Sequence, residues 1–329
     1  MSVLVLNERD LRECVQLDER VIAQIESGFV ALALGHALVP PILRLDVKEH
    51  NGEMDVKTAY VQGLAQFALK LSCGFFDNPN RNLPSLSGMM VLLSAETGLV
   101  EAVLLDNGYL TDVRTAAAGA LAARLLAPQR VEVAGVIGAG TQARLQMRAL
   151  ALVRPFKQLL VWARDATKAG IYAREMEGAL GIPVTVCPSA QTVVENATVV
   201  VTTTPSKEPL VHAEWLHAGI HITAMGSDAE DKNEVAPEAL ARADLIVCDH
   251  LPQCKRLGEL HHALEAGVLT DDTAVVDLGS IASGAMIGRT RDEEISICDL
   301  TGTGVQDTMI AIAAVAAAQA RSYGMRLGA

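Results

Sequence analysis

The sequence predicts an α/β protein in which a Rossmann-type, doubly wound parallel sheet is joined to a second, α+β domain. The chain has 329 residues, more than the roughly 250–300 at which a single hydrophobic core stops growing. Strand-like and helix-like segments alternate from residue 129 to residue 304, as in a parallel sheet covered by helices. Consecutive strands without intervening helices precede this region and indicate an antiparallel or mixed sheet.

Composition excludes several function classes. Apolar residues make up 50% of the chain and charged residues 20%, which is typical of a globular protein. The net charge of 27 − 39 = −12 disfavours a nucleic-acid partner, because no basic stripe is available for phosphates. An apolar run of about 18 residues, as a membrane span needs, is absent, and the N-terminus is too charged for a signal peptide. We therefore expect a cytoplasmic protein with a small-molecule partner.

The first region begins with helical spacing of apolar residues and then becomes strand-like. A helical pattern covers residues 7–34, and four β-like runs follow at 56–61, 66–72, 88–94 and 100–106. A segment rich in Gly, Pro and Asn interrupts them at 74–84. The region ends with a helix over 111–126, because Pro128 acts as a stop signal.

The second region alternates regularly. Predicted strands lie at 133–137, 158–163, 184–186, 197–202, 221–225, 244–248, 274–277 and 295–298, with helices at 141–153 and 165–180. A final helix, 304–323, is long enough to fold back onto the first domain. The predicted domains are therefore 1–128 together with 305–329, and 129–304.

A glycine-rich loop lies between the first strand and first helix of the second region. Residues 138–143 read G-x-G-x-x-A, where Gly138 allows a tight turn, Gly140 admits a pyrophosphate, and Ala143 keeps helix and strand close. The backbone amides of Thr141 and Gln142 would face the phosphates at the helix N-terminus. The strand-loop-helix context predicts dinucleotide binding rather than an ordinary glycine turn.

The end of the next strand leaves the choice between NADH and NADPH open. Arg164 follows Gly138 by 26 positions, and Asp165 comes directly after it. An acidic residue at this place accepts hydrogen bonds from the ribose of NAD, whereas an arginine can pair with the 2′-phosphate of NADP. Arg164 favours NADPH, but it can equally stack on adenine while Asp165 caps the following helix.

Four cationic residues of the first region are candidate substrate ligands: Arg44, Lys57, Lys70 and Arg114. Three of them lie within apolar or β-like stretches, where a buried charge requires a partner. The alternative is that each reaches the surface or pairs with an acidic neighbour such as Asp46, Asp55, Asp106 or Asp112.

Several ordered blocks resemble the ornithine cyclodeaminase/mu-crystallin family over essentially the whole chain. In order, they are Lys70, Asn78-Pro79, Leu83-Pro84, Thr97-Gly98, Asp106, Leu110-Thr111-x2-Arg114-Thr115-Ala116-Ala117, Ile137-Gly138-Ala139-Gly140-x-Gln142, Met225-Gly226-Ser227-Asp228-x3-Lys232-x-Glu234 and Thr301-Gly302 with Gln306-Asp307. Together these blocks are far more specific than any one of them.

The resemblance implies roles for individual residues. Arg44, Lys70 and Arg114 would hold the substrate α-carboxylate, and Lys70 and Asp228 would be the catalytic pair, with Asp228 moving the proton beside the nicotinamide. The residues implied for the cofactor, beyond those of the glycine loop, are Arg164, Asp165, Thr203, Met225, Ser227 and Lys232. The resemblance also implies a homodimer built through the sheet of the first domain.

Lys57 departs from the ornithine cyclodeaminases, which carry a glutamate at this place. A lysine repels the side-chain ammonium of ornithine and attracts a second carboxylate; the alternative is a surface lysine. The blocks 55–60 and 74–79 look most like the ectoine-utilisation branch and its iminosuccinate reductase relatives. The sequence thus predicts an NAD(P)H-dependent reductase of a small imino acid, iminosuccinate to aspartate. The alternatives are an ammonia lyase of the ornithine cyclodeaminase type, with a role in ectoine degradation, and a non-catalytic binding protein.

The cysteines and histidines predict no metal site. The six cysteines are scattered, with no CxxC pair, so they form neither a zinc site nor a disulfide framework. His261 and His262 are adjacent and should point to different sides of a helix or strand, which favours polar contacts over metal ligation.

Overall fold

The computed structural model describes residues 2–328 and divides into two compact units. The first unit runs up to Arg114 and resumes at Thr303, and the second is Thr115–Gly302. Positions 1 and 329, where the predicted first domain begins and ends, lie outside the described residues. The division falls within helix α3 (Tyr109–Leu126) rather than at 128/129, because the later part of this helix packs in the core of the second unit through Ala123.

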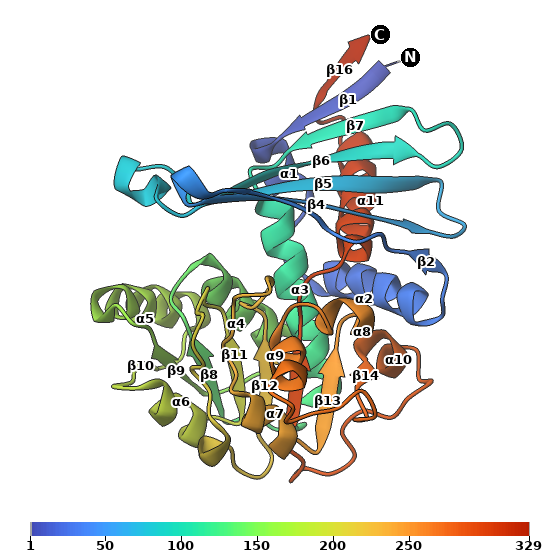
Figure 1. Ribbon diagram of the computed structural model, residues 1–329. Helices are drawn as coiled ribbons and strands as arrows, with labels where there is room; N and C mark the ends of the chain where they lie inside the picture. Colours follow the sequence, from blue (N-terminus) through green and yellow to red (C-terminus); the bar gives the residue numbers. More distant parts are fainter. Residues whose placement is uncertain (1, 329) are drawn as a thin grey trace. The chain divides into compact units, whose positions relative to one another are not determined.

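The first unit contains a mixed sheet (Figure 1). Its order is β16-β1-β7-β6-β5-β4-β2, with β3 also paired to β4. Only the β1–β7 pair is parallel among the described strands of this sheet. The strands are β1 (Ser2–Asn7), β2 (Ala37–Leu38), β3 (Leu43–Val47), β4 (Gly52–Val61), β5 (Gln66–Phe75), β6 (Leu86–Ser94), β7 (Val100–Leu105) and β16 (Met325–Gly328). The helices are α1 (Glu8–Cys14), α2 (Glu19–Ala33) and α11 (Gly304–Ala320), besides the start of α3.

Helix α11 covers one face of this sheet and is tied to it by a buried hydroxyl. Thr308 Oγ1 donates to the carbonyl of Ala59 on β4 at 2.8 Å and accepts from the amide of Ala68 on β5 at 3.1 Å. The side chains beneath the helix are small or apolar and fully buried, such as Met90 and Leu92 on β6. The C-terminal helix therefore folds back onto the first sheet, and Asp307 is held above β4 and β5.

The second unit is a doubly wound sheet with every described strand parallel, as the sequence predicts. Its order is β10-β9-β8-β11-β12-β15-β13-β14. The strands are β8 (Val133–Ile137), β9 (Gln158–Trp162), β10 (Val184–Val186), β11 (Val199–Thr202), β12 (His221–Ala224), β13 (Leu245–Cys248), β14 (Val276–Asp277) and β15 (Ser296–Asp299). The helices are α4 (Thr141–Val153), α5 (Ala166–Leu180), α6 (Ala190–Asn196), α7 (Pro237–Arg242), α8 (Leu251–Cys254), α9 (Glu259–Glu265) and α10 (Leu278–Ala282).

The chain reverses direction across this sheet between β8 and β11. It runs from β8 outward to β9 and β10, and then returns to β11 on the other side of β8. In open parallel sheets, ligands bind at the carboxyl ends of strands flanking such a switch point. The topology thus selects the loops after β8 and β11 for the candidate site.

The N-terminal segment differs from the predicted single helical region. Residues Ser2–Asn7 form β1, and a break before Asp18 separates α1 from α2. Asn7 and Asp18 each cap the following helix by accepting from a backbone amide. Strand β1 pairs with β7 and β16, which are distant in sequence, so its local pattern alone did not reveal it.

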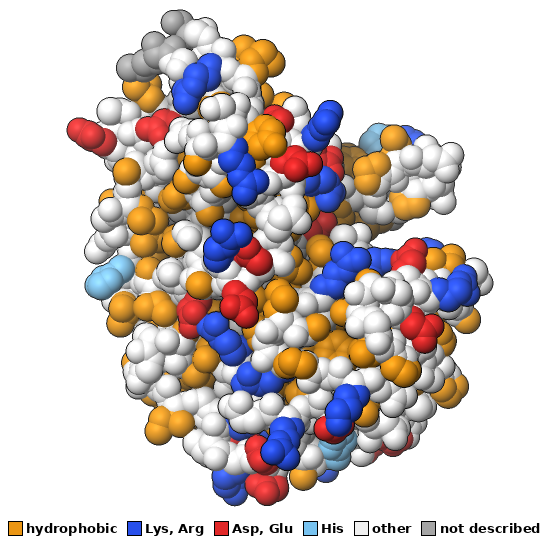
Figure 2. All heavy atoms as spheres, turned by 180° about the vertical axis from the view of Figure 1, so that it is seen from behind, with side chains coloured by type: hydrophobic (Ala, Val, Ile, Leu, Met, Phe, Trp, Pro, Cys, Tyr) orange, Lys and Arg blue, Asp and Glu red, His pale blue; other side chains and the backbone are white. Residues whose placement is uncertain are grey.

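Charges on the surface are mixed in sign. On the face drawn in Figure 2, Lys and Arg side chains alternate with Asp and Glu side chains. In residues 2–328, no helix combines the length and apolarity that crossing a bilayer requires.

Candidate functional site

The loop between β8 and α4 has the backbone geometry of a phosphate-binding turn. Gly138 has a φ of +120°, and a Cβ there would lie 2.3 Å from Thr203 Oγ1, so only glycine fits. A Cβ at Gly140 would meet nothing within 4 Å. Gly140 is also the N-cap of α4, and no side chain caps its amides. The open space in front of these amides suits a pyrophosphate, whose negative charge the helix N-terminus favours.

Arg144 braces this loop from the first turns of α4. Its guanidinium donates to the carbonyls of Ala139 at 2.6 Å and Gly140 at 3.1 Å, and its Nε donates to Glu175 on α5 at 2.8 Å. Thr203, which directly follows β11, donates to the carbonyl of Ile137 through both its amide and its hydroxyl. Arg144 was not singled out by sequence analysis, since an arginine in a helix has no distinguishing pattern.

The end of β9 carries the two residues proposed to choose the cofactor. Asp165 is the N-cap of α5, and its Oδ1 accepts from the amides of Thr167 at 2.9 Å and Lys168 at 3.1 Å. Arg164 is exposed. The capping role considered for Asp165 is therefore present, and the exposed side of this strand end is basic.

A buried glutamate holds together the loops after β11 and β12. Glu234 accepts from Thr202 Oγ1 at 2.6 Å, from the amide and hydroxyl of Thr204 at 2.6 and 2.7 Å, and from the amide of Gly226 at 2.8 Å. Burial raises the pKa of its carboxyl. A second buried carboxyl, Glu259, accepts from the amides of Glu234 and Val235, and burial raises its pKa strongly.

The same loop carries the proposed proton donor. Asp228 Oδ1 lies 2.6 Å from Lys232 Nζ, and the Ser227 hydroxyl donates to the backbone carbonyl of Lys232. Thus Lys232, implied as a cofactor ligand, contacts the Asp228 carboxylate, while Met225 packs against the core that includes Val136 and Val201. The sequence identified this block but not the bracing role of its last residue, Glu234.

Lys57, Lys70, Arg114 and Asp307 form a buried charge cluster in the first unit. Lys57 on β4 and Lys70 on β5 are directly opposite each other in the sheet and are 6% and 2% exposed. Asp307 Oδ2 lies 3.1 Å from Lys70 Nζ, and its Oδ1 accepts from Arg114 Nε at 2.9 Å. Arg114 also donates to Gln306 Oε1 at 2.7 Å. The burial of Lys57 contradicts its alternative interpretation as a surface lysine.

The cluster contains three basic side chains and one carboxylate. Burial, together with the nearby charges of Arg114 and Lys57, lowers the pKa of Lys70 to about 7, although Asp307 opposes this. Burial acts to raise the pKa of Asp307, but Lys70, Arg114 and Lys57 outweigh it and lower the pKa. With every group ionised, the cluster carries a net charge of +3 − 1 = +2. Sequence analysis included Asp307 in a motif but missed its role as counter-ion.

Arg44 is bound differently from the other three cations. Its guanidinium contacts the carboxylates of Asp46 at 3.0 Å, Glu53 at 2.6 Å and Asp55 at 3.9 Å, and its side chain is partly exposed. A substrate carboxylate would have to compete with three carboxylates for it. The contact with Asp46 and Asp55 is the pairing that the sequence allowed as the alternative.

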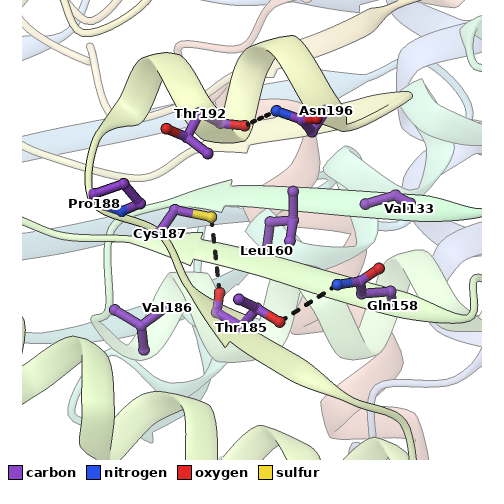
Figure 3. Close-up of a pocket in the computed structure, with 9 residues that line it drawn as sticks. All are labelled: Val133, Gln158, Leu160, Thr185, Val186, Cys187, Pro188, Thr192 and Asn196. Atoms are coloured by element: carbon purple, nitrogen blue, oxygen red, sulfur yellow. Dashed lines mark hydrogen bonds between the residues drawn. The ribbon is translucent and has the colours of Figure 1, made fainter.

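A groove in the second unit is lined by other residues (Figure 3). It has a volume of about 360 Å³ and is lined by the starts of β8 and β9, by β10 and by α6. Its hydrogen bonds are internal, such as Gln158 Nε2 to Thr185 Oγ1 at 3.4 Å. None of the described residues proposed for cofactor or substrate lines it, so we do not assign it to the site.

Comparisons with known proteins identify the family of this chain. The family model "Ornithine cyclodeaminase/mu-crystallin family" matches residues 1–321. An uncharacterized cyclodeaminase of Sinorhizobium fredii is 55% identical over 98% of both chains. The alanine dehydrogenase of Archaeoglobus fulgidus is 35% identical, covering 99% of this chain and 98% of its own.

Solved structures give the same result. An archaeal alanine dehydrogenase dimer with bound NAD has a TM-score of 0.92 and 32% identity, covering 100% and 99% of the two chains. The iminosuccinate reductase of Paracoccus denitrificans with NAD+ has a TM-score of 0.92 and 31% identity, covering 100% of each. The Thermococcus litoralis Δ1-pyrroline-2-carboxylate reductase with NADH and L-proline has a TM-score of 0.93 and 28% identity, covering 99% and 100%. The chain belongs to the ornithine cyclodeaminase/mu-crystallin family.

Proposed function

We propose that the protein is an NAD(P)H-dependent reductase of a short imino dicarboxylate, converting iminosuccinate to aspartate. The observation that carries this proposal is the buried cluster of Lys57, Lys70 and Arg114 around the carboxylate of Asp307; a second buried carboxyl group, Asp106, lies within electrostatic reach of Lys70, but burial raises its pKa and so disfavours its charged form. Buried charges of one sign are costly unless they are compensated. An excess of two positive charges matches the two carboxylates of a dicarboxylate substrate.

The cluster offers two kinds of anion site. Arg114 presents a planar guanidinium, which suits the α-carboxylate, and the neighbouring Lys70 adds a compact positive charge. Lys57 on β4, which lies opposite Lys70 on β5, is proposed to bind the distal carboxylate. Arg44 is the alternative ligand for this carboxylate. A glutamate at position 57 would instead favour a cationic side chain, as ornithine has.

The reaction consumes one hydride and one proton: iminosuccinate, NAD(P)H and H⁺ give aspartate and NAD(P)⁺. NADH or NADPH held at the β8–α4 loop would supply the hydride for the imine carbon. Asp228 would relay a proton from water to the imine nitrogen, and the ammonium of Lys232 holds the Asp228 carboxylate in place. The chain's contributions are thus orientation of the substrate and delivery of a proton.

We infer that NADH or NADPH binds along the β8–α4 loop, with Arg164 at the ribose. The open space at Gly140 and the position of this residue at the N-terminus of α4 support this, and the structures similar to this chain contain NAD+ or NADH. The exposed Arg164 favours a 2′-phosphate, since Asp165 is engaged as a helix cap. We place the enzyme in the cytoplasm, where its six free cysteines stay reduced.

The experiment that tests the function follows cofactor and amino acid together. Purified enzyme is supplied with oxaloacetate and ammonium, which generate iminosuccinate, and with NADH or NADPH; loss of the reduced cofactor must match aspartate formed. Oxaloacetate without ammonium is the control for keto-acid reduction. Pyruvate with ammonium, pyrroline-2-carboxylate and ornithine are tested in parallel. Ammonia released from ornithine without net cofactor change would establish cyclodeamination instead, the reaction that the name of the 55% identical relative suggests.

Replacing Lys57 by alanine should separate dicarboxylate from monocarboxylate substrates. We expect KM for iminosuccinate to rise at least tenfold, because the distal carboxylate loses its cation, while KM for the imine of pyruvate changes little. Steady-state kinetics on both substrates measure the difference, and Lys48→Ala, an exposed lysine, is the control. Equal changes on both substrates would remove the basis for choosing a dicarboxylate.

Binding of a dicarboxylate should weaken above neutral pH. Lys70 has a pKa of about 7, so it is charged below that value and loses its charge as the pH rises. We expect the inhibition constant of succinate, calculated for the dianion so that the titration of its second carboxyl near pH 6 is removed, to be constant below about pH 7 and to increase above it. Lys70→Arg should abolish this break because arginine stays charged, and Lys70→Met should bind succinate weakly at every pH. A pH-independent constant in the unmodified enzyme would contradict the assignment.

The first unit should form a homodimer through the outer face of its sheet. The sheet face opposite α11 carries apolar side chains, although a solvent-facing sheet face is normally polar. Leu43 and Leu45 on β3 are 58% and 50% exposed. Val56, Leu69 and Val91 on this face are only partly buried. Such an apolar sheet face normally marks an interface. We expect a dimer by light scattering at micromolar concentration and a monomer for Leu43→Glu/Leu45→Glu. Ile171→Glu, which changes an exposed apolar residue of α5, should remain dimeric.

A further inference from the structure

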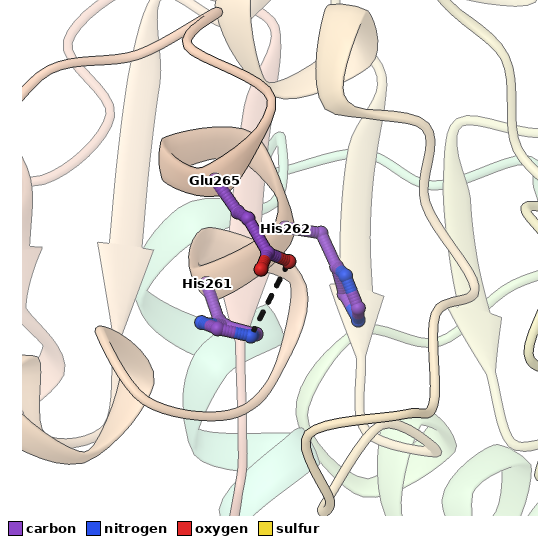
Figure 4. A group of neighbouring side chains, drawn as sticks. All are labelled: His261, His262 and Glu265. Atoms are coloured by element: carbon purple, nitrogen blue, oxygen red, sulfur yellow. Dashed lines mark ion pairs between the residues drawn. The ribbon is translucent and has the colours of Figure 1, made fainter.

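Helix α9 presents two histidines and a glutamate as one group, which the proposed reaction does not use (Figure 4). Each of the three residues offers one ligand atom, and these atoms lie within 4.8 Å of one another: they come from His261, His262 and Glu265. The two imidazole rings have centroids 5.2 Å apart, although adjacent histidines were expected to point to different sides. The group is accessible, since Glu265 is 71% exposed and both histidines are partly exposed.

Each imidazole is held by a backbone carbonyl through one of its nitrogens. His262 Nε2 lies 2.8 Å from the carbonyl of Lys232, and His261 Nδ1 lies 3.4 Å from the carbonyl of Lys255. A carbonyl only accepts hydrogen bonds, so in each ring the nitrogen facing it carries the proton. In the neutral ring the other nitrogen, Nδ1 of His262 or Nε2 of His261, carries the lone pair that a metal ion needs. Metal-binding histidines are held in this way, with the second nitrogen donating to a carbonyl or carboxylate.

One pair of these ligand atoms is close to the spacing in a tetrahedral metal site, and all three lie within 4.8 Å of one another. Bonds of about 2.0–2.1 Å place two ligand atoms of a tetrahedral site roughly 3.3–3.4 Å apart. His261 Nε2 and Glu265 Oε2 are 3.7 Å apart, so a shift of a few tenths of an ångström brings them to that distance. Imidazole and carboxylate together suit zinc and its neighbours in the first transition row rather than magnesium or calcium, which take oxygen ligands only.

We propose that His261, His262 and Glu265 form a binding site for a divalent transition-metal ion such as Zn²⁺, with water completing the coordination. The site shares no residue with the buried charge cluster or with the glycine loop, and it does not depend on the reductase activity. His262 also links it to the segment that carries Asp228, since its Nε2–H donates to the Lys232 carbonyl, which the Ser227 hydroxyl contacts as well.

Metal titration of the full-length protein tests the site. After removal of metal with a chelator, calorimetry with ZnCl₂ should give one equivalent bound per chain, and CoCl₂ should produce the visible absorption of tetrahedral cobalt. His261→Ala and Glu265→Gln should each weaken Zn²⁺ binding about tenfold or more, and the exposed Glu265 allows the second change without effect on folding. His50→Ala, which changes an exposed histidine elsewhere, should bind as the unmodified protein does.

Three results would overturn the proposal. The first is the absence of any Zn²⁺ binding by the unmodified protein. The second is one equivalent bound with unchanged affinity in both His261→Ala and Glu265→Gln, which would place the ion at other residues such as the cysteines. The third is equal affinity for Mg²⁺ and Zn²⁺, which would indicate only a general attraction of cations to carboxylates.

Discussion

Gly140→Val should abolish binding of NADH and NADPH while leaving the fold intact. A Cβ at this position meets no atom of the protein within 4 Å, and the backbone φ of −85° is one that valine adopts without strain. The added side chain therefore fills only the space in front of the α4 amides, where the pyrophosphate must approach. We expect affinity for either nucleotide to fall at least 100-fold, measured by fluorescence titration or calorimetry.

Gly178 provides a matched control for this change. It lies within α5, and a Cβ there also meets no atom within 4 Å. Gly178→Val should therefore bind both nucleotides as the unmodified protein does, with a melting temperature similar to that of Gly140→Val. Normal nucleotide affinity in Gly140→Val would show that the cofactor does not use this loop.

Arg114→Ala should reduce kcat/KM for the imino acid by about 100- to 1000-fold. Removing one partner from a buried, hydrogen-bonded group of charges costs about 2–5 kcal/mol, and the truncated side chain also leaves Asp307 and Gln306 without their guanidinium contacts. The kcat/KM of Arg114→Lys should lie between those of the unmodified enzyme and of Arg114→Ala, because lysine keeps the positive charge but lacks the planar guanidinium with its two parallel donors. Steady-state kinetics at fixed, saturating cofactor measure the effect.

The same kinetics will rank the two arginines proposed for the substrate. Arg44 is already surrounded by Asp46, Glu53 and Asp55, so we expect Arg44→Ala to lose less than tenfold in kcat/KM. Arg20→Ala, which breaks an exposed ion pair with Asp18, should leave kcat/KM unchanged. A loss in Arg44→Ala equal to that in Arg114→Ala would mean that both arginines contact the substrate.

The second unit was the more predictable part of the chain. Strands β8 and β10 and helix α4 have the predicted bounds because each is a short local pattern: an apolar run, or a helical repeat that directly follows the glycine loop. Parallel strands buried on both faces read as continuous apolar runs, which are easily seen. The parallel, doubly wound sheet followed from this alternation, whereas the order of its strands was not predicted.

The first unit was less predictable because long-range pairing determines it. Strand β1 pairs with β7 and β16, which lie far along the chain. The six residues of β1 alone carry no pattern that predicts this pairing. The charge cluster illustrates the same limit. Lys57 and Lys70 face each other only once β4 and β5 are in register, and Asp307 comes from the last helix. The sequence identified the cations, but not the carboxylate that holds two of them.

The order of the chain has a consequence for folding during synthesis. The second unit is contiguous, Thr115–Gly302, so every residue of its core is synthesised before α11. The first unit must wait for α11, which covers β4 and β5, and for β16, which pairs with β1. Until then Lys57, Lys70 and Arg114 lack the Asp307 carboxylate and remain in water. Although it is translated first, the anion-binding unit is therefore the last to become native, and a chain terminated before Thr303 should yield a folded nucleotide-binding unit attached to an unfolded N-terminal segment.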